Sequence, residues 1–174
     1  FLENWSNAAE YAKKVLSNKL MIDPIKLEAE FIKGTALYHV ENYTEAKASL
    51  EWVVKNTTTV LAPEAKFYLA EMYYKQKDNV KAEAEIRALL KMKPAFNFWN
   101  AKALILQTKV LIAKDDLFQA EHTLGSVIKN YDDDDDGILL EANQLWDELM
   151  QLKTVPKTVE EKQPTEIEIN TKRK

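Results

Sequence analysis

One short pattern occurs four times along this chain and constrains its fold more than any other feature. Two polar residues end one helical segment, an aromatic or large apolar residue usually follows, and a small residue sits in the first turn of the next segment. The copy at residues 41–46 reads Glu-Asn-Tyr-Thr-Glu-Ala. The small residues are Ala8, Ala46, Ala82 and Ala120, so the pattern returns after 38, 36 and 38 residues. A period in this range, built from paired helices, is typical of a solenoid.

The composition favours helices throughout. The chain has 174 residues, of which 46% are hydrophobic, which is enough for one cooperative domain. Only 3 Gly and 5 Pro interrupt it, and no run of alternating residues bounded by turn signals indicates a sheet. The absence of Cys excludes disulfides, thiolate metal sites and cysteine nucleophiles.

The charge pattern excludes some classes of partner. With 24 basic and 28 acidic residues the net charge is -4, so no broad basic field is available for nucleic acid. No apolar run approaches the roughly 18 residues that a membrane-spanning helix needs. The chain begins with Phe1, inside a running repeat, so we expect it to be a fragment of a longer protein.

Apolar periodicity and turn signals divide the chain into six parts. Asp23 is expected to cap a helix whose first turn contains Pro24, and Gly34 should permit close approach of a neighbouring helix. The apolar stripes of the expected helices include Val15, Ile32 and Leu140. We expect the second helix of a truncated repeat plus a linker at 1–22, repeats at 23–60, 61–96 and 97–131, a capping helix at 132–152 and a flexible tail at 153–174.

Residues 4–152 resemble tetratricopeptide repeats. The small residue of the first helix and the large residue of the second fall at fixed places in each repeat, although the family's closing Pro is met only by Pro94. These residues are Gly34, Ala70 and Thr108 in the first helices, and Leu50, Ile86 and Leu124 in the second helices. The resemblance implies an all-α, right-handed α-solenoid of antiparallel helix pairs with a C-terminal capping helix. It also implies a non-catalytic role in protein binding.

Two segments, residues 8–16 and 98–106, are similar to the C-terminal parts of large repeat proteins of bacterial cell envelopes. This narrower resemblance favours the periplasm or cell envelope, with the cytoplasm as the alternative. The tail contains an alternating stretch at 165–170 that would suit a strand if a partner offered a sheet edge.

The first helix of each pair should line the concave face of such a stack, where a protein or peptide partner would bind. Aromatic residues with charged neighbours are typical of recognition surfaces, although the same aromatics could complete the core between repeats. The sequence leaves both readings open. The predicted binding residues are Phe31, Thr35, Tyr38, His39, Phe67, Glu71, Tyr74, Lys75, Lys102 and Lys109.

We expect no metal site, cofactor or catalytic residue. Asp132 to Asp136 resemble the start of a calcium loop, but the twelfth position, which needs Glu, is Asn143, so acidic residues at a helix N-terminus are the better interpretation. His39 and His122 lie about two repeats apart without a relay partner. The four Trp residues, each 47 positions from the next, fall at different places in their helices and are expected to pack rather than to form a site.

The sequence therefore predicts an interaction scaffold or adaptor that binds its partner through the concave face. One alternative is a purely structural end-piece of a longer repeat protein. A less favoured alternative is a small-molecule or glycan-binding module, which should show a closed pocket of several hundred Å³ that an open solenoid rarely has.

Overall fold

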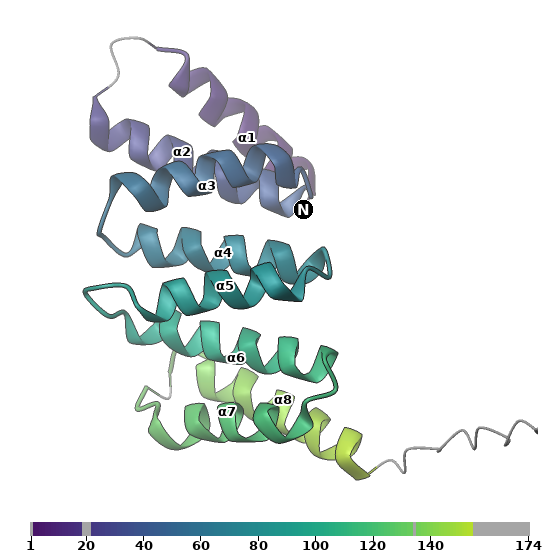
Figure 1. Cartoon of the computed structure of the whole chain (residues 1–174). Coiled ribbons are helices and arrows are strands. Elements are labelled where there is room, and N and C mark those ends of the chain that lie inside the picture. The colour runs from purple at the N-terminus through teal and green to yellow at the C-terminus, as the bar shows by residue number, and fades with distance from the viewer. Residues whose placement is uncertain (1, 19–21, 134, 155–174) are drawn as a thin grey trace, which may run out of the picture.

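The computed structural model describes residues 2–18, 22–133 and 135–154, and these form helices without any strand (Figure 1). The prediction of an all-α fold is confirmed. The expected tail beyond residue 154, with its strand-like stretch, lies outside the described residues. The helices are α1 (Leu2–Leu16), α2 (Asp23–His39), α3 (Tyr43–Asn56), α4 (Leu61–Lys75), α5 (Asn79–Leu90), α6 (Asn97–Ala113), α7 (Leu117–Asn130) and α8 (Ile138–Thr154).

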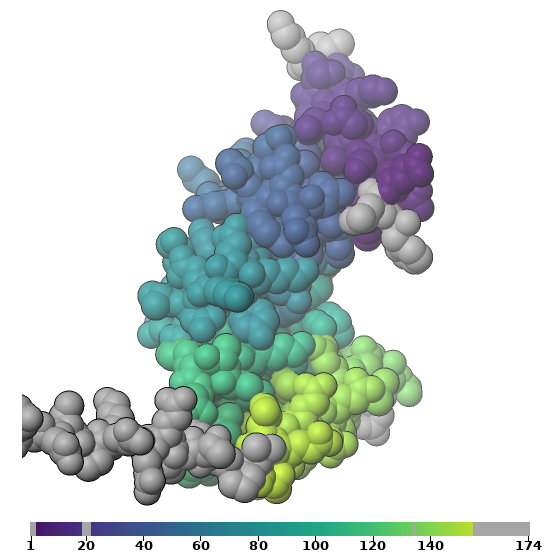
Figure 2. Space-filling model, turned by 90° about the vertical axis from the view of Figure 1, so that its right-hand side faces the viewer, coloured from purple at the N-terminus to yellow at the C-terminus, as the bar shows by residue number. Residues whose placement is uncertain are grey.

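The helices stack one after another and form two rows (Figure 1). Each helix packs against the next in sequence, and α2, α4, α6 and α8 also contact one another in order; we call these the inner helices. The outer helices α1, α3, α5 and α7 make no comparable backbone contact with one another within the described residues. Because the inner row is closer together than the outer row, the stack bends toward the inner helices, as a solenoid does. Figure 2 shows the resulting elongated body.

The recurring sequence pattern forms the same turn three times. At each turn a residue with φ near 60° ends the inner helix, and the next residue donates its amide hydrogen to the carbonyl five positions back, as in Asn42 to Leu37 at 2.9 Å. This is the Schellman geometry of a helix end. The side chain of this same residue caps the outer helix, because it accepts a hydrogen bond from the amide three positions further on. The residues with positive φ are Glu41, Lys77 and Asp115, and the capping residues are Asn42, Asp78 and Asp116.

The helix pairs join through small residues on the inner helix that face large ones on the outer helix. A side chain on Gly34 would place its first carbon 2.9 Å from Leu50, so Gly at this point allows the close approach predicted from the sequence. Ala70 and Thr108 occupy the corresponding places and are fully buried. Leu50, Ile86 and Leu124 are buried opposite them in sequence register.

Helix α8 closes the C-terminal end of the stack. Ile138, Ala142, Leu145 and Leu149 are buried in the same cluster as residues of α6 and α7. The opposite side of α8 carries polar residues such as Asp147, which is exposed. One apolar face buried and one polar face in water is the arrangement that ends a solenoid.

Four details differ from expectation. Helix α2 begins at Asp23, and the N-cap position before it is held by Ile22, which makes no side-chain cap. The prediction that Asp23 caps the helix is therefore wrong. Val15, Ile32 and Leu140 were expected in apolar stripes, but they are exposed. Val15 and Ile32 lie at the open N-terminal end of the stack, and Leu140 lies on the outer side of α8, so no neighbouring helix covers them.

Candidate binding surface

The predicted binding residues all lie on the inner helices α2, α4 and α6, and we call this set the inner face. They differ in exposure. Thr35, Tyr38 and Phe67 are buried, so they support the surface from below. The accessible members are Lys75, which is exposed, and the half-buried Phe31, His39, Glu71, Tyr74, Lys102 and Lys109.

A part-buried hydrogen bond links the first two inner helices. The Tyr38 hydroxyl on α2 donates to a carboxylate oxygen of Glu71 on α4 at 2.7 Å. The ammonium of Lys75 lies 4.4 Å from the centre of the Tyr38 ring, a cation–π distance. Burial, and then the hydrogen bond to Glu71, raise the pKa of the Tyr38 phenol far above its usual value. Tyr38 therefore stays protonated at neutral pH and donates to the Glu71 carboxylate.

Two lysines on α6 share one carboxylate on α8. Lys102 and Lys109 bind different oxygens of Glu141, at 2.7 and 2.8 Å. Burial alone would raise the pKa of Glu141, but the hydrogen bonds and positive charges of the two lysines outweigh it and lower the pKa below its usual value. Lys102 also lies 5.5 Å from the centre of the Phe67 ring on α4, so it connects three successive inner helices.

His39 lies at the end of the inner face that is nearest the N-terminus. Its ring stacks on Trp5 of α1, with ring centres 4.0 Å apart and planes 17° apart. Partial burial, and then the charge of Lys75, lower the pKa of His39 against the opposing effect of Glu71. His39 is therefore predominantly neutral at pH 7. His122 lies elsewhere, on the outer helix α7, where it contacts Phe118.

Aromatic contacts continue from α1 to α6 and include residues that sequence reasoning missed. Tyr68 of α4 packs 5.0 Å from the Tyr38 ring, and Trp99 of α6 packs 5.6 Å from the Phe67 ring. Tyr68 lies three residues before Glu71 on the same face of α4, so the helical register alone could have placed it beside the predicted binding residues. Glu141 was missed because the capping helix was read only as a cover for the apolar core.

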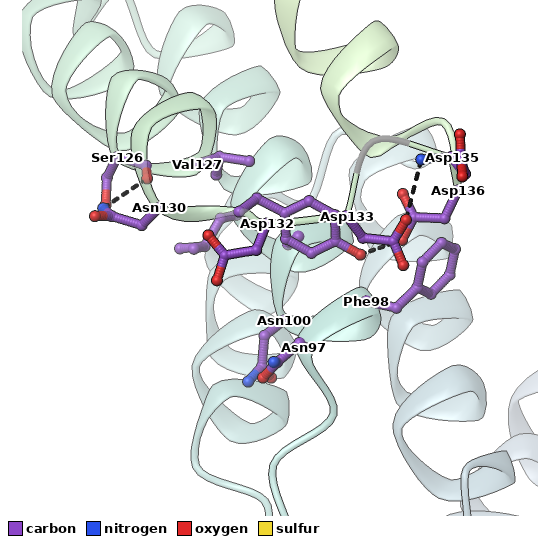
Figure 3. Close-up of a pocket in the computed structure, with 13 residues that line it drawn as sticks. Asn97, Phe98, Asn100, Ser126, Val127, Asn130, Asp132, Asp133, Asp135 and Asp136 are labelled. Atoms are coloured by element: carbon purple, nitrogen blue, oxygen red, sulfur yellow. Dashed lines mark hydrogen bonds between the residues drawn. The ribbon is translucent and has the colours of Figure 1, made fainter.

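A separate surface cleft of about 790 Å³ lies where the start of α6, the end of α7 and the loop before α8 meet (Figure 3). Aromatic, amide and carboxylate side chains line it, among them Phe98, Asn100, Asn130, Tyr131 and Asp132. The exposed acidic loop partly serves local structure: Asp136 accepts from the Ile138 amide at the start of α8 and from the Tyr131 hydroxyl. Among the described residues, no group of three or more acidic, His or Cys side chains has a geometry suited to a metal ion. None of the described helices combines the length and apolar character needed to cross a membrane.

Stacked antiparallel helix pairs with an accessible inner row define a helical repeat solenoid. The model of the tetratricopeptide repeat family matches residues 31–96, from the middle of α2 to just beyond α5. Residues 31–96 therefore consist of tetratricopeptide repeats. This family is a non-enzymatic repeat scaffold that generally mediates protein–protein interactions. The chain has no significant match among curated proteins or among solved structures.

Proposed function

We propose that this chain is a non-catalytic scaffold or adaptor that binds a protein partner through the inner face. The observation that carries the proposal is the combination of part-buried side-chain bridges and accessible side chains on the same helices. Tyr38 with Glu71, and Lys102 and Lys109 with Glu141, connect successive inner helices. A surface held in this way loses little conformational entropy when a partner binds.

The accessible side chains are of the kinds that protein interfaces use. Phe31 and Tyr74 are half-buried aromatics, which provide contact area at a low entropic cost. Lys75 and His39 flank them and would set orientation and specificity. The family's clamp for a peptide carboxylate needs basic and amide residues at the positions of Phe31 and Thr35, so we propose a contact with a folded or extended protein segment rather than with a chain terminus.

The test is a crosslinked pull-down with the full chain and matched variants. Tyr74→Ala should reduce capture of a specific partner at least about tenfold, as expected for an aromatic anchor. Val80→Ala removes an exposed apolar side chain from the outer helix α5 and should leave capture unchanged. Circular dichroism must show equal helix content in both variants. Equal capture by both variants would contradict binding through the inner face and would favour a purely structural end-piece.

A second candidate function rests on the cleft beside the acidic loop. Its volume of about 790 Å³ is within the range of small-molecule sites, and aromatic and amide side chains are suited to sugar rings. Because exposed carboxylates form one wall, it is an open cleft rather than a closed pocket. If the chain is a glycan-binding module, a panel of mono- and disaccharides should shift the amide resonances of Asn100 and Asn130. Phe98→Ala should remove those shifts, whereas Tyr74→Ala should not.

A further inference from the structure

The half-buried carboxylate of Glu64 on α4 has no partner among the described residues, where it makes neither a hydrogen bond nor an ion pair. Burial alone raises the pKa of this carboxyl. Every other half-buried carboxylate in the described part of the chain has a partner, as Glu83 has Lys114 at 2.6 Å. These others are Glu30, Glu71, Asp78, Glu85, Glu121 and Glu141. Because charges that are partly removed from water are normally paired, Glu64 is an exception that calls for an explanation.

The lysines of the inner helices all have other partners. Lys66 of α4 pairs with Glu85 of the outer helix α5 at 2.5 Å, and Lys102 of α6 pairs with Glu141 at 2.7 Å. Lys75, in the last turn of α4, lies over the Tyr38 ring. Lys26, Lys33, Lys109 and Lys153 also contact residues other than Glu64. Within the described residues, the inner helices therefore supply no counter-charge to Glu64.

Glu64 lies on the inner side of α4. It precedes Phe67 by three residues and Glu71 by seven, so the helical period places it on the face that carries these two predicted binding residues. Tyr68 is one turn further along α4, and burial, followed by the charge of Glu64, raises the pKa of its phenol. The carboxylate thus has an aromatic neighbour on an accessible surface. Glu28 occupies the same register on α2, but it is exposed to water.

We propose that Glu64 binds a cationic side chain, Arg or Lys, of the protein partner that occupies the inner face. This inference rests on the proposed function and adds the chemistry of the partner, which presents a positive charge to the first turn of α4. A guanidinium group donates two hydrogen bonds to one carboxylate and stacks on aromatic rings, so Arg suits Glu64 and Tyr68 better than Lys does. A negative charge without an internal partner also disfavours acidic segments, which contributes to specificity.

The test uses two small probes with the full chain, N-acetylarginine methylamide and its neutral counterpart N-acetylcitrulline methylamide. In nuclear magnetic resonance titrations at pH 7, the arginine probe should shift the ring resonances of Tyr68 and bind at least about fivefold more tightly than the citrulline probe. Glu64→Gln should remove this preference, whereas Glu28→Gln, at the exposed counterpart, should retain it. Equal binding of the two probes, or shifts by the arginine probe that are confined to the acidic loop before α8, would overturn the proposal.

The partner captured by crosslinking separates this inference from the proposed function. Glu64→Gln should weaken capture at least about fivefold, and Glu28→Gln should leave it unchanged. If Tyr74→Ala loses the partner while Glu64→Gln retains it, the inner face binds without a cationic anchor, so the inference fails and the proposed function stands. If both variants retain the partner, both fail. Circular dichroism must show equal helix content in all variants.

Discussion

At the scale of single residues, the same helix-ending turn recurs, and each copy holds one residue in a strained backbone conformation. Three turns place Glu41, Lys77 and Asp115 at φ near 60°, a region that residues with a side chain adopt at a cost of roughly 1–2 kcal/mol. The strain is offset because each turn satisfies the last carbonyls of one helix and the first amides of the next. The turn pattern in the sequence predicted where these turns fall. It could not predict their left-handed residues, because none of the three is Gly.

Lys77→Gly should therefore stabilise the chain. Gly relieves the left-handed strain but adds entropy to the unfolded state, so we expect a net gain of about 0.5–1 kcal/mol in the free energy of unfolding. Urea denaturation followed by circular dichroism measures it. The matched control is Ala84→Gly, at an exposed position inside α5, which should lose about 1 kcal/mol. If Lys77→Gly lost about as much stability as the control, the claim that the backbone is strained at Lys77 would be contradicted.

At the scale of helices, the burial of an apolar side chain depends on which other helices pack against its helix. The residue pattern within one helix does not show this. Ile32 and Leu106 occupy the same register, yet only Leu106 has inner helices on both sides. This is why the apolar stripes were predicted correctly in the middle of the stack and wrongly at Val15, Ile32 and Leu140. The candidate site shows the same limit: register placed all ten predicted residues on the inner helices, but only packing shows that Tyr38 is buried and Lys75 is exposed.

The junction between α6 and α8 should depend on pH through Glu141. Its pKa is lower in the folded chain than in the unfolded chain, so its contribution to stability is complete above the unfolded pKa. That contribution is lost as the pH falls through the lower, folded value, in the acid range below about 4.5. Glu141→Gln should cost about 1 kcal/mol or less at pH 7 and should reduce the loss of stability between pH 5 and pH 3. Denaturation at several pH values checks this. If Glu141→Gln lost as much stability between pH 5 and pH 3 as the unchanged chain, the pairing of Glu141 with the two lysines would be contradicted.

At the scale of the whole molecule, a stack in which helices contact only near neighbours should respond locally to damage. Leu124→Ala removes a fully buried side chain between α7 and its neighbours and should cost about 2–5 kcal/mol. The loss of amide-exchange protection should be greatest in α6, α7 and α8 and small in α2. Leu50→Ala should give the reverse distribution, with α2 and α3 affected most. Uniform loss along the chain in both variants would indicate a single cooperative globule instead.

The period and the matched residues were enough to predict stacked helix pairs, because no pair can bury its apolar side alone. The identity of the partner and the cell-envelope location stay predictions, since neither follows from helix packing. What the stack adds is a set of accessible side chains along one row of helices, with part-buried side-chain bridges between those helices.

The most direct test of inner-face binding is amide hydrogen exchange of the full chain, alone and bound to the partner captured by crosslinking. Binding through the inner face should slow exchange in α2, α4 and α6 and leave exchange in α3, α5 and α7 unchanged. Protection confined to the outer helices, or to the cleft between α6, α7 and the acidic loop, would contradict it.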